Sequence, residues 1–158
     1  MGERIDYLDD PAAPKANSVV PSANVIVVND QGDILMIRRT DNDNWAVPGG
    51  GMDLGESITD TAVRETREET GISCEITGLV GIYTNPRHVI LYTSNGEVRQ
   101  EFSIVFTARP VSGELLPSNE SSEPQWVSPA AIPAMQMHPS MRQRIQHYLD
   151  ERPEPFLG

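Results

Sequence analysis

Residues 50–72 read GGMDLGESITDTAVRETREETGI, and this stretch decides the fold. Residues 57–70 predict a helix, because Ser57 can cap its start and Asp60 follows three residues later, as in a capping box. Gly71 comes directly after this helix and provides a stop signal. The glycines before the helix predict a loop that can fold back over its start.

Three glutamates, Glu65, Glu68 and Glu69, fall on one flank of the apolar face of this helix. Their i, i+3, i+4 spacing makes them neighbours, and such like-charge pairs cost a few tenths of a kcal/mol each in water. A solvated, glutamate-rich surface helix is one interpretation. The other is a set of oxygen ligands, which together with a loop carbonyl suits Mg²⁺ or Mn²⁺. The apolar face consists of Ile58, Ala62, Val63 and Thr66.

The stretch resembles the Nudix box, G-x5-E-x7-R-E-U-x-E-E-x-G-U, in which U is a bulky apolar residue. Thr66 departs mildly at the first U position. The resemblance covers about residues 18–150 and implies an α/β fold, an α/β/α sandwich with a mixed sheet and a loop–helix–loop box. Residues 1–17 are expected to be an irregular N-terminal arm and residues 151–158 a C-terminal tail. The matching positions are Gly50, Glu56, Arg64, Glu65, Glu68, Glu69, Gly71 and Ile72.

The resemblance also implies a catalytic metal site. Glu68 and Glu69 correspond to the family's ligands for a divalent cation, and Glu65 to a further ligand or the general base. The carbonyl of Gly49 is expected to complete the metal shell. The implied cofactor is Mg²⁺ or Mn²⁺.

Other residues receive supporting roles from the same resemblance. Glu56 and Arg64 correspond to a structural salt bridge that pins the loop to the helix. Arg39, at the end of an apolar strand, is expected to bind substrate. Glu120 and Glu123, in a late loop, are alternative candidates for the general base or a metal ligand.

Outside the box the pattern mixes strands and helices. Residues 23–28 and 34–39 predict a hairpin, and residues 110–124 an irregular functional loop. In the segments near Ser94-Asn95-Gly96, Glu101 is expected to face outward and His88 to be structural. Further strands are predicted at 45–48, 75–83, 88–93, 99–109 and 125–128, with a helical turn at 129–132 and a helix at 139–149.

Composition excludes several classes of protein. The single cysteine, Cys74, rules out an internal disulfide framework and a cysteine-built metal site. No apolar run approaches the length of a membrane span. The formal net charge is -11, with 12 basic residues of which one is a lysine, so a basic surface for nucleic acid is not expected. A cytoplasmic enzyme without a nucleic-acid or membrane partner is the default, with a homodimer left open.

The leading functional hypothesis is hydrolysis of the pyrophosphate in a nucleoside diphosphate linked to a moiety X. ADP-ribose is favoured because Pro86 lies 14 residues beyond Ile72, near the place where ADP-ribose members carry a proline. One alternative is a housecleaning hydrolase of oxidised nucleoside triphosphates. Another is a non-catalytic Nudix domain that senses a nucleotide, although the three box glutamates favour catalysis.

Overall fold

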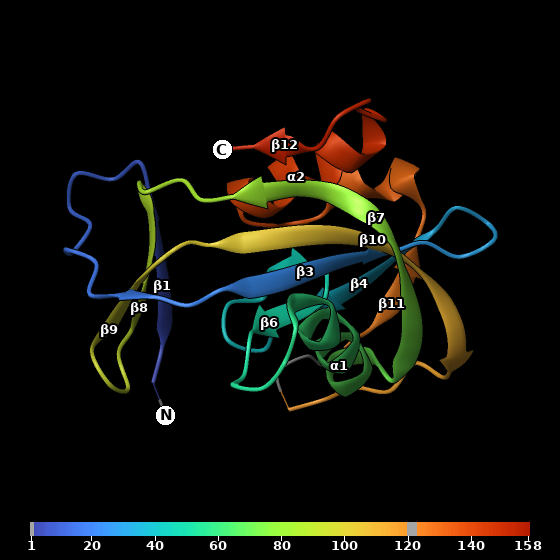
Figure 1. Ribbon diagram of the computed structural model, residues 1–158, viewed down its shortest axis with the longest axis horizontal. Coiled ribbons are helices and arrows are strands. Elements are labelled where there is room, and N and C mark those ends of the chain that lie inside the picture. The colour runs from blue at the N-terminus through green and yellow to red at the C-terminus, as the bar shows by residue number, and fades with distance from the viewer. Residues whose placement is uncertain (1, 120–122) are drawn as a thin grey trace.

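The computed structural model describes residues 2–119 and 123–158. It has a mixed sheet with one helix on each side, as Figure 1 shows. The helices are α1 (Ile58–Thr70) and α2 (Pro139–Leu149), and a 3-10 helix, η1 (Pro129–Ala134), precedes α2. The predicted α/β/α sandwich is confirmed. The strands are β1 (Arg4–Leu8), β2 (Ser18–Val19), β3 (Ser22–Val27), β4 (Ile34–Arg38), β5 (Trp45–Ala46), β6 (Gly49–Gly51), β7 (Ile72–Tyr83), β8 (His88–Tyr92), β9 (Glu97–Gln100), β10 (Ser103–Gly113), β11 (Gln125–Val127) and β12 (Phe156–Leu157).

The central sheet has the strand order β12-β7-β10-β3-β6. It is mixed, because β10 runs parallel to β3 and antiparallel to β7. Alternate side chains of β3 enter two separate cores. Ile26 packs in the core that includes Ile145 of α2, while Val25 and Val27 pack in the core that includes Ala62 of α1. Burial on both faces explains the apolar run of residues 25–27 at the end of β3.

The predicted hairpin of residues 23–28 and 34–39 is wrong. β3 belongs to the central sheet, whereas β4 pairs with β11 and β5 in a three-stranded sheet. The two strands meet in one isolated bridge between Val28 and Ile34. All residues of β4 except Arg38 are buried, so the apolar pattern of this strand does not specify which partner it pairs with.

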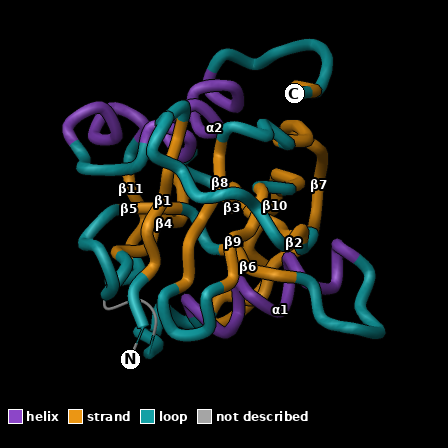
Figure 2. The backbone as a smooth tube through the Cα atoms, turned by 90° about the vertical axis from the view of Figure 1, so that its left-hand side faces the viewer, coloured by secondary structure: helices purple, strands orange, loops and turns teal. Residues whose placement is uncertain are grey.

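The N-terminal segment is more ordered than predicted. Residues 4–8 are expected to be irregular, but they form β1, which pairs antiparallel with β8 from Arg4 opposite Tyr92 to Leu8 opposite His88. These two strands lie at the left of Figure 1, on the side that faces the viewer in Figure 2. The five residues of β1 lie beside a proline-rich segment, and their alternation of polar and apolar side chains is too short to predict a strand. The other end of the chain also pairs, since β12 lies parallel to β7.

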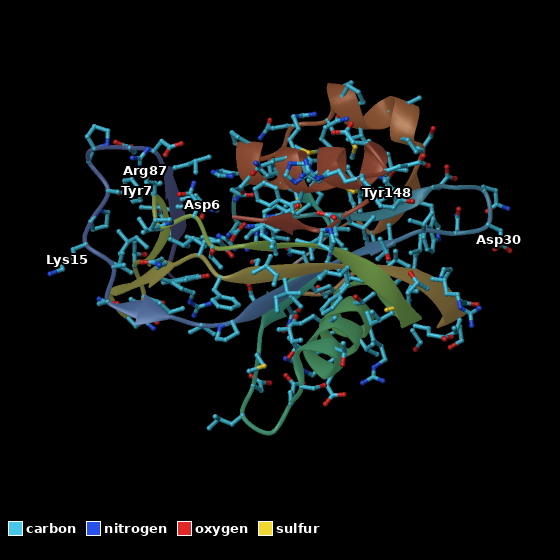
Figure 3. The ribbon with its side chains drawn as sticks, turned by 45° about the horizontal axis from the view of Figure 1, so that its top comes forward. Asp6, Tyr7, Lys15, Asp30, Arg87 and Tyr148 are labelled. Carbon is cyan, nitrogen blue, oxygen red and sulfur yellow. The ribbon has the colours of Figure 1, made fainter. Side chains whose placement is uncertain are left out.

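Two of the loops lie at opposite ends of the molecule. Lys15, after β1, and Asp30, in the turn between β3 and β4, lie at opposite ends of the molecule (Figure 3). Among the residues that the structure describes, no helix combines the length and hydropathy that a membrane crossing requires.

Candidate active site

Helix α1 has the ends that its sequence predicts. The Ser57 hydroxyl accepts a hydrogen bond from the backbone N–H of Asp60 (3.1 Å), and the Asp60 carboxylate accepts one from the N–H of Ser57 (3.0 Å). Gly71 follows the helix at φ 83°, a left-handed conformation that glycine adopts without a steric penalty. A Cβ at Gly71 would also collide with the carbonyl oxygen of Glu114. These ends fix the rotation of the helix and therefore the direction in which its glutamates point.

The three box glutamates differ in exposure. Glu69 is 3% exposed, whereas the side chains of Glu65 and Glu68 are 14% and 57% exposed. This order agrees with the helical angles, which place Glu69 closest to the apolar face. Ala62 and Thr66 of that face are fully buried. A carboxylate as buried as that of Glu69 is costly unless a hydrogen bond, a cation or a metal compensates it.

Strand β6 brings the glycine-rich backbone against these glutamates. The N–H of Gly49 donates to Oε1 of Glu69 (3.2 Å). A Cβ on Gly50 would lie 2.5 Å from Cδ of Glu65, so a larger residue here would displace that carboxylate. Antiparallel pairing with β3, with Asn24 opposite Gly49, holds β6 in place. The loop backbone and the carboxylates of α1 are therefore in direct contact.

Arg64 is the centre of the polar contacts of the box. Its Nε and Nη2 donate to both oxygens of Glu56 (2.6 and 2.9 Å), and its Nη1 donates to Glu65 (2.9 Å) and Glu68 (3.2 Å). Asp53 lies 3.3 Å from Nη2. Hydrogen bonds from Arg64 are the largest cause that lowers the pKa of Glu56 to about 2. The Glu56–Arg64 pair thus ties the loop to the helix, and the same guanidinium orients two of the glutamates.

The donor set fits a hard divalent cation. One guanidinium contacts four carboxylates, and the buried carboxylate of Glu69 lies beside them, so the cluster carries a net negative charge. Carboxylate and backbone carbonyl oxygens are the ligands that Mg²⁺ and Mn²⁺ take. Of the candidate ligands from the sequence, Glu65 and Glu68 share the guanidinium of Arg64, and Glu69 contacts the N–H of Gly49.

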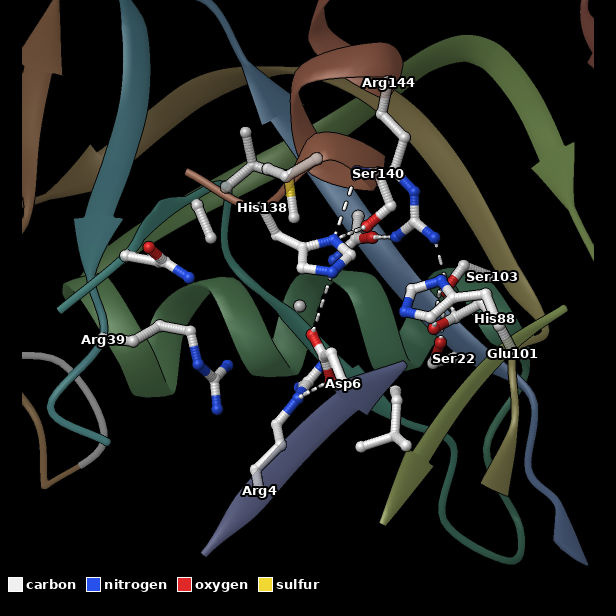
Figure 4. A pocket seen from close by; sticks show the side chains of 18 of the residues that line it. Arg4, Asp6, Ser22, Arg39, His88, Glu101, Ser103, His138, Ser140 and Arg144 are labelled. Carbon is white, nitrogen blue, oxygen red and sulfur yellow. Dashed lines mark hydrogen bonds and ion pairs between the residues drawn. The ribbon is translucent and has the colours of Figure 1, made fainter. Parts of the chain in front are cut away.

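A cavity of about 130 Å³ opens beside the glycines. Arg39 lines it and pairs with Asp41 (2.7 Å). Tyr92 lines it too, with the guanidinium of Arg99 4.8 Å from its ring centroid. Figure 4 shows Arg39 on one side of this cavity and a cluster of ionisable groups on the other. The residues of the box that line it are Gly50, Gly51 and Glu69, and Gly49 directly precedes them.

The late-loop candidates lie elsewhere or outside the described residues. Glu123 is exposed and pairs with Arg38 (3.2 Å), and neither residue is among those that line the cavity. Glu120 falls outside the described residues. Pro86 lines a different hollow, formed with Arg87 and the loop after β1.

Glu101 and His88, on either side of the turn at residues 94–96, are both buried. Glu101 does not face outward: it is 8% exposed, accepts a hydrogen bond from the Ser103 hydroxyl, and lies 3.7 Å from Arg144. The predicted strand at 99–109 is interrupted between β9 and β10, and Glu101 lies at this interruption, where the side chains do not follow the alternation of one continuous strand. His88 is buried, as a structural histidine would be, but it also lines the cavity.

Several cavity residues escaped the sequence analysis. Arg4 and Asp6 come from β1, and His138 and Arg144 come from the start and middle of α2. The alternation of Arg4 and Asp6 in RIDYL was the available signal for β1. Residues more than 130 positions apart meet here, which no local pattern could predict.

The fold and the site define a class: hydrolases that cleave phosphoric anhydrides with a loop–helix–loop of glycines and glutamates. The chain belongs to the NUDIX domain family, whose model matches residues 19–148. A MutT-like protein of Streptomyces ambofaciens is 36% identical over 129 residues, which cover 80% of this chain and 75% of that protein. A putative 8-oxo-dGTP diphosphatase of Bacillus subtilis is 31% identical over 126 residues, covering 80% and 77%.

A solved structure supports the fold independently. The crystal structure of a NUDIX hydrolase from Nitrosomonas europaea superposes with a TM-score of 0.71, covering 90% of this chain and 78% of that one. The sequence identity is 23%, so this likeness concerns the fold alone. The chain is therefore a Nudix hydrolase in family and in architecture.

Proposed function

We propose that this protein is a divalent-metal-dependent pyrophosphohydrolase of nucleoside diphosphates linked to a second moiety, with ADP-ribose as the substrate type. The observation that carries the proposal is the buried Glu69, which lies beside Glu65 and Glu68 and directly against the glycine strand β6. Glu69 is also the one of these three glutamates that lines the cavity, and placing like charges next to one another on a helix does not by itself stabilise it.

The residues take the following roles in this proposal. Glu65, Glu68, Glu69 and the carbonyl of Gly49 hold the cation, which would offset charge on the phosphates and activate water. Arg64 holds Glu65 and Glu68 in position. Glu65 is the favoured general base, since Arg64 holds its carboxylate in position against Gly50, which lines the cavity.

The arginines of the cavity are neutralised by carboxylates, and so we expect it to bind a substrate with two phosphates and a sugar better than a more highly charged triphosphate. Each arginine that lines it is already within 4 Å of a carboxylate. Ser22 and Asn24 add uncharged hydrogen-bonding groups, which suit hydroxyls. We assign the binding of a substrate phosphate to Arg39, which would exchange its ion pair with Asp41 for one with the phosphate. The pairs are Arg4–Asp6, Arg39–Asp41, Arg99–Glu97 and Arg144–Glu101.

A second candidate is hydrolysis of an oxidised nucleoside triphosphate. The name of the Bacillus subtilis relative favours it. In either case we propose a cytoplasmic enzyme of small nucleotides, and the 23 acidic against 12 basic residues argue against a nucleic-acid substrate.

A product screen tests these candidates. Purified protein is incubated with ADP-ribose, 8-oxo-dGTP and a dinucleoside polyphosphate, each with Mg²⁺, with Mn²⁺ and with excess chelator, and products are separated by chromatography. We expect AMP from ADP-ribose, and no product in chelator. Pyrophosphate from 8-oxo-dGTP with ADP-ribose untouched would select the second candidate, and full turnover in chelator would refute metal dependence. Nucleotide binding without any turnover would support a sensing domain.

A further inference from the structure

A second cluster of metal-ligating side chains lies across the cavity from the box. Asp6 comes from β1, His88 from the start of β8 and His138 from the N-terminal end of α2. Each offers one ligand atom, and these atoms lie within 4.8 Å of one another. Figure 4 shows the two imidazole rings facing each other with Asp6 below His138. Three separate elements thus bring two imidazoles and a carboxylate to one place.

Each member of this cluster has a polar partner on its outer side. Nε of Arg4 donates to Oδ1 of Asp6 (3.0 Å). Nδ1 of His138 lies 2.7 Å from the Ser140 hydroxyl, while its Nε2 faces Oδ2 of Asp6 at 3.8 Å. Nδ1 of His88 faces Oε2 of Glu101, also at 3.8 Å. Such outer partners orient the ligands of metal sites and select the tautomer of each histidine.

The inner nitrogen of His88 is an independent sign of a missing partner. His88 is 3% exposed, and its Nε2 makes no hydrogen bond to any residue that the structure describes. A carboxylate opposite Nδ1 favours a proton on Nδ1, which leaves a lone pair on Nε2. A buried lone pair that accepts no hydrogen bond is unfavourable, and either a proton donor or a Lewis acid would stabilise it. An anionic ligand would be repelled by it.

The surroundings permit a cation. The charged groups that face the cluster are Arg4, Arg144, Asp6 and Glu101, whose formal charges cancel. Burial lowers the pKa of both His88 and His138. The neutral imidazole is the form that binds metal.

We propose that Asp6, His88 and His138 form a transition-metal site, of the Zn²⁺ type, that is separate from the carboxylate site of the box. Two imidazoles and one carboxylate suit Zn²⁺ and its neighbours in the first transition row, whereas Mg²⁺ prefers oxygen ligands. The two rings are stacked, with centroids 5.2 Å apart and planes 13° apart. An imidazole binds metal in the plane of its ring, so one ring must turn out of the stack as the ligand atoms approach the roughly 3.4 Å separation of tetrahedral ligands. Three protein ligands leave one position open toward the cavity.

Metal binding at this site requires a particular tautomer of His138. The backbone N–H of Ser140 also points at Nδ1 (3.2 Å), which favours a proton on Nε2 in the metal-free protein. With metal on Nε2, the proton lies on Nδ1 and is donated to the Ser140 hydroxyl, and the backbone N–H of Ser140 loses its acceptor. The binding of a transition metal should therefore switch the tautomer of His138 and leave that of His88 unchanged.

The chain offers a matched control, since it has three histidines and the third lies outside the cluster. His147 stacks on Tyr83 and lies tilted against Phe156, and its Nδ1 lies 2.8 Å from the Tyr83 hydroxyl. The test uses the full-length Glu68→Gln/Glu69→Gln protein, in which the box site is disabled, and adds His88→Gln, His138→Gln or His147→Gln. Circular dichroism and melting curves establish that each variant is folded.

Zn²⁺ is titrated against a chromophoric chelator, and Co²⁺ is followed by its visible absorption. We expect one equivalent to bind in the background protein and in His147→Gln, and binding at least about 10²-fold weaker in His88→Gln and His138→Gln. Nitrogen-15 spectra of histidine-labelled parent protein should show shifts of His88 and His138 with Zn²⁺ but not with Mg²⁺. No binding, or equal binding by all three histidine variants, overturns the proposal. These readouts do not involve turnover, so they stand or fall independently of the proposed function.

Discussion

Glu69 is the residue whose substitution best separates a catalytic box from a charged surface helix. In Glu69→Gln the amide oxygen can still accept from the N–H of Gly49, but the negative charge is lost. Turnover should fall at least about 10²-fold, which corresponds to about 3 kcal/mol of activation free energy. Without Mg²⁺ the free energy of unfolding should change by no more than about 0.5 kcal/mol, because a like-charge contact is removed. Steady-state kinetics and melting curves measure both quantities.

The matched control is Glu75→Gln, which removes a surface glutamate that pairs with Arg109 on the central sheet. It should leave turnover unchanged. Added Mg²⁺ should raise the melting temperature of the parent and of this control but not of Glu69→Gln, because only proteins that bind the ion gain stability from it. An active Glu69→Gln protein would show that the carboxylate is not part of the reaction.

The Glu56–Arg64 pair predicts a pH dependence of stability. The pKa of Glu56 falls from an ordinary value of 4.5 to about 2 in the folded protein. A depressed pKa stabilises the folded state above the unfolded pKa, and this contribution is lost as the pH falls from about 4.5 through 2. The parent should therefore melt above Glu56→Gln at neutral pH, and the difference should shrink over that window. A difference that is constant from pH 7 to pH 2 would contradict the assignment.

At the level of elements, α1 depends on its C-terminal glycine. Gly71→Ala places a Cβ at φ 83° and against the carbonyl oxygen of Glu114. The left-handed conformation alone costs about 1–2 kcal/mol, and the collision adds to it. Gly32→Ala is the control, since Gly32 has φ 80° but open space around it. Chemical denaturation should show a larger loss for Gly71→Ala, and equal losses would mean that the contact with Glu114 relaxes freely.

The sequence was most informative where the determinants of an element are local. The capping box of Ser57 and Asp60, the stop at Gly71 and the helical angles predicted α1 and the depth of Glu69 correctly. Strand pairing was predicted less well. β3 and β4 both carry buried apolar residues on both faces, so their sequences do not indicate which sheet each strand joins. The short turn between them wrongly suggested a hairpin.

For the whole molecule, the net charge of -11 predicts an unusual response to salt. A nucleotide approaching a strongly acidic protein is repelled at long range, and salt screens this repulsion. At fixed free Mg²⁺, kcat/KM should rise as the Debye length shortens from about 30 Å to about 8 Å, between roughly 0.01 and 0.15 M ionic strength. The kcat at saturating substrate should not change. A fall in kcat/KM would mean that the arginines of the cavity dominate the encounter.

Only the part of the candidate site that the box provides was predictable from the sequence. The glutamates and glycines of the box lie within one short stretch, and the resemblance to a known motif covers them. The opposite wall is assembled from Asp6, His88 and His138, which are separated by about 80 and 50 positions along the chain. Their meeting depends on the pairing of β1 with β8 and on the docking of α2, which are tertiary events that leave no local pattern.

The parallel pairing of β3 with β10 also dictates when the enzyme can mature during synthesis. Ser22 and Ser103, which open the paired segments, are 81 residues apart. At about 5–20 residues per second, a ribosome needs roughly 4–16 s to make the intervening chain. During that interval β3 has been made but lacks the neighbour that pairs with one of its edges, and an unpaired apolar edge favours aggregation. The glycine strand β6 pairs with β3, so the hydrolytic centre forms late in translation, although most of its residues are made early.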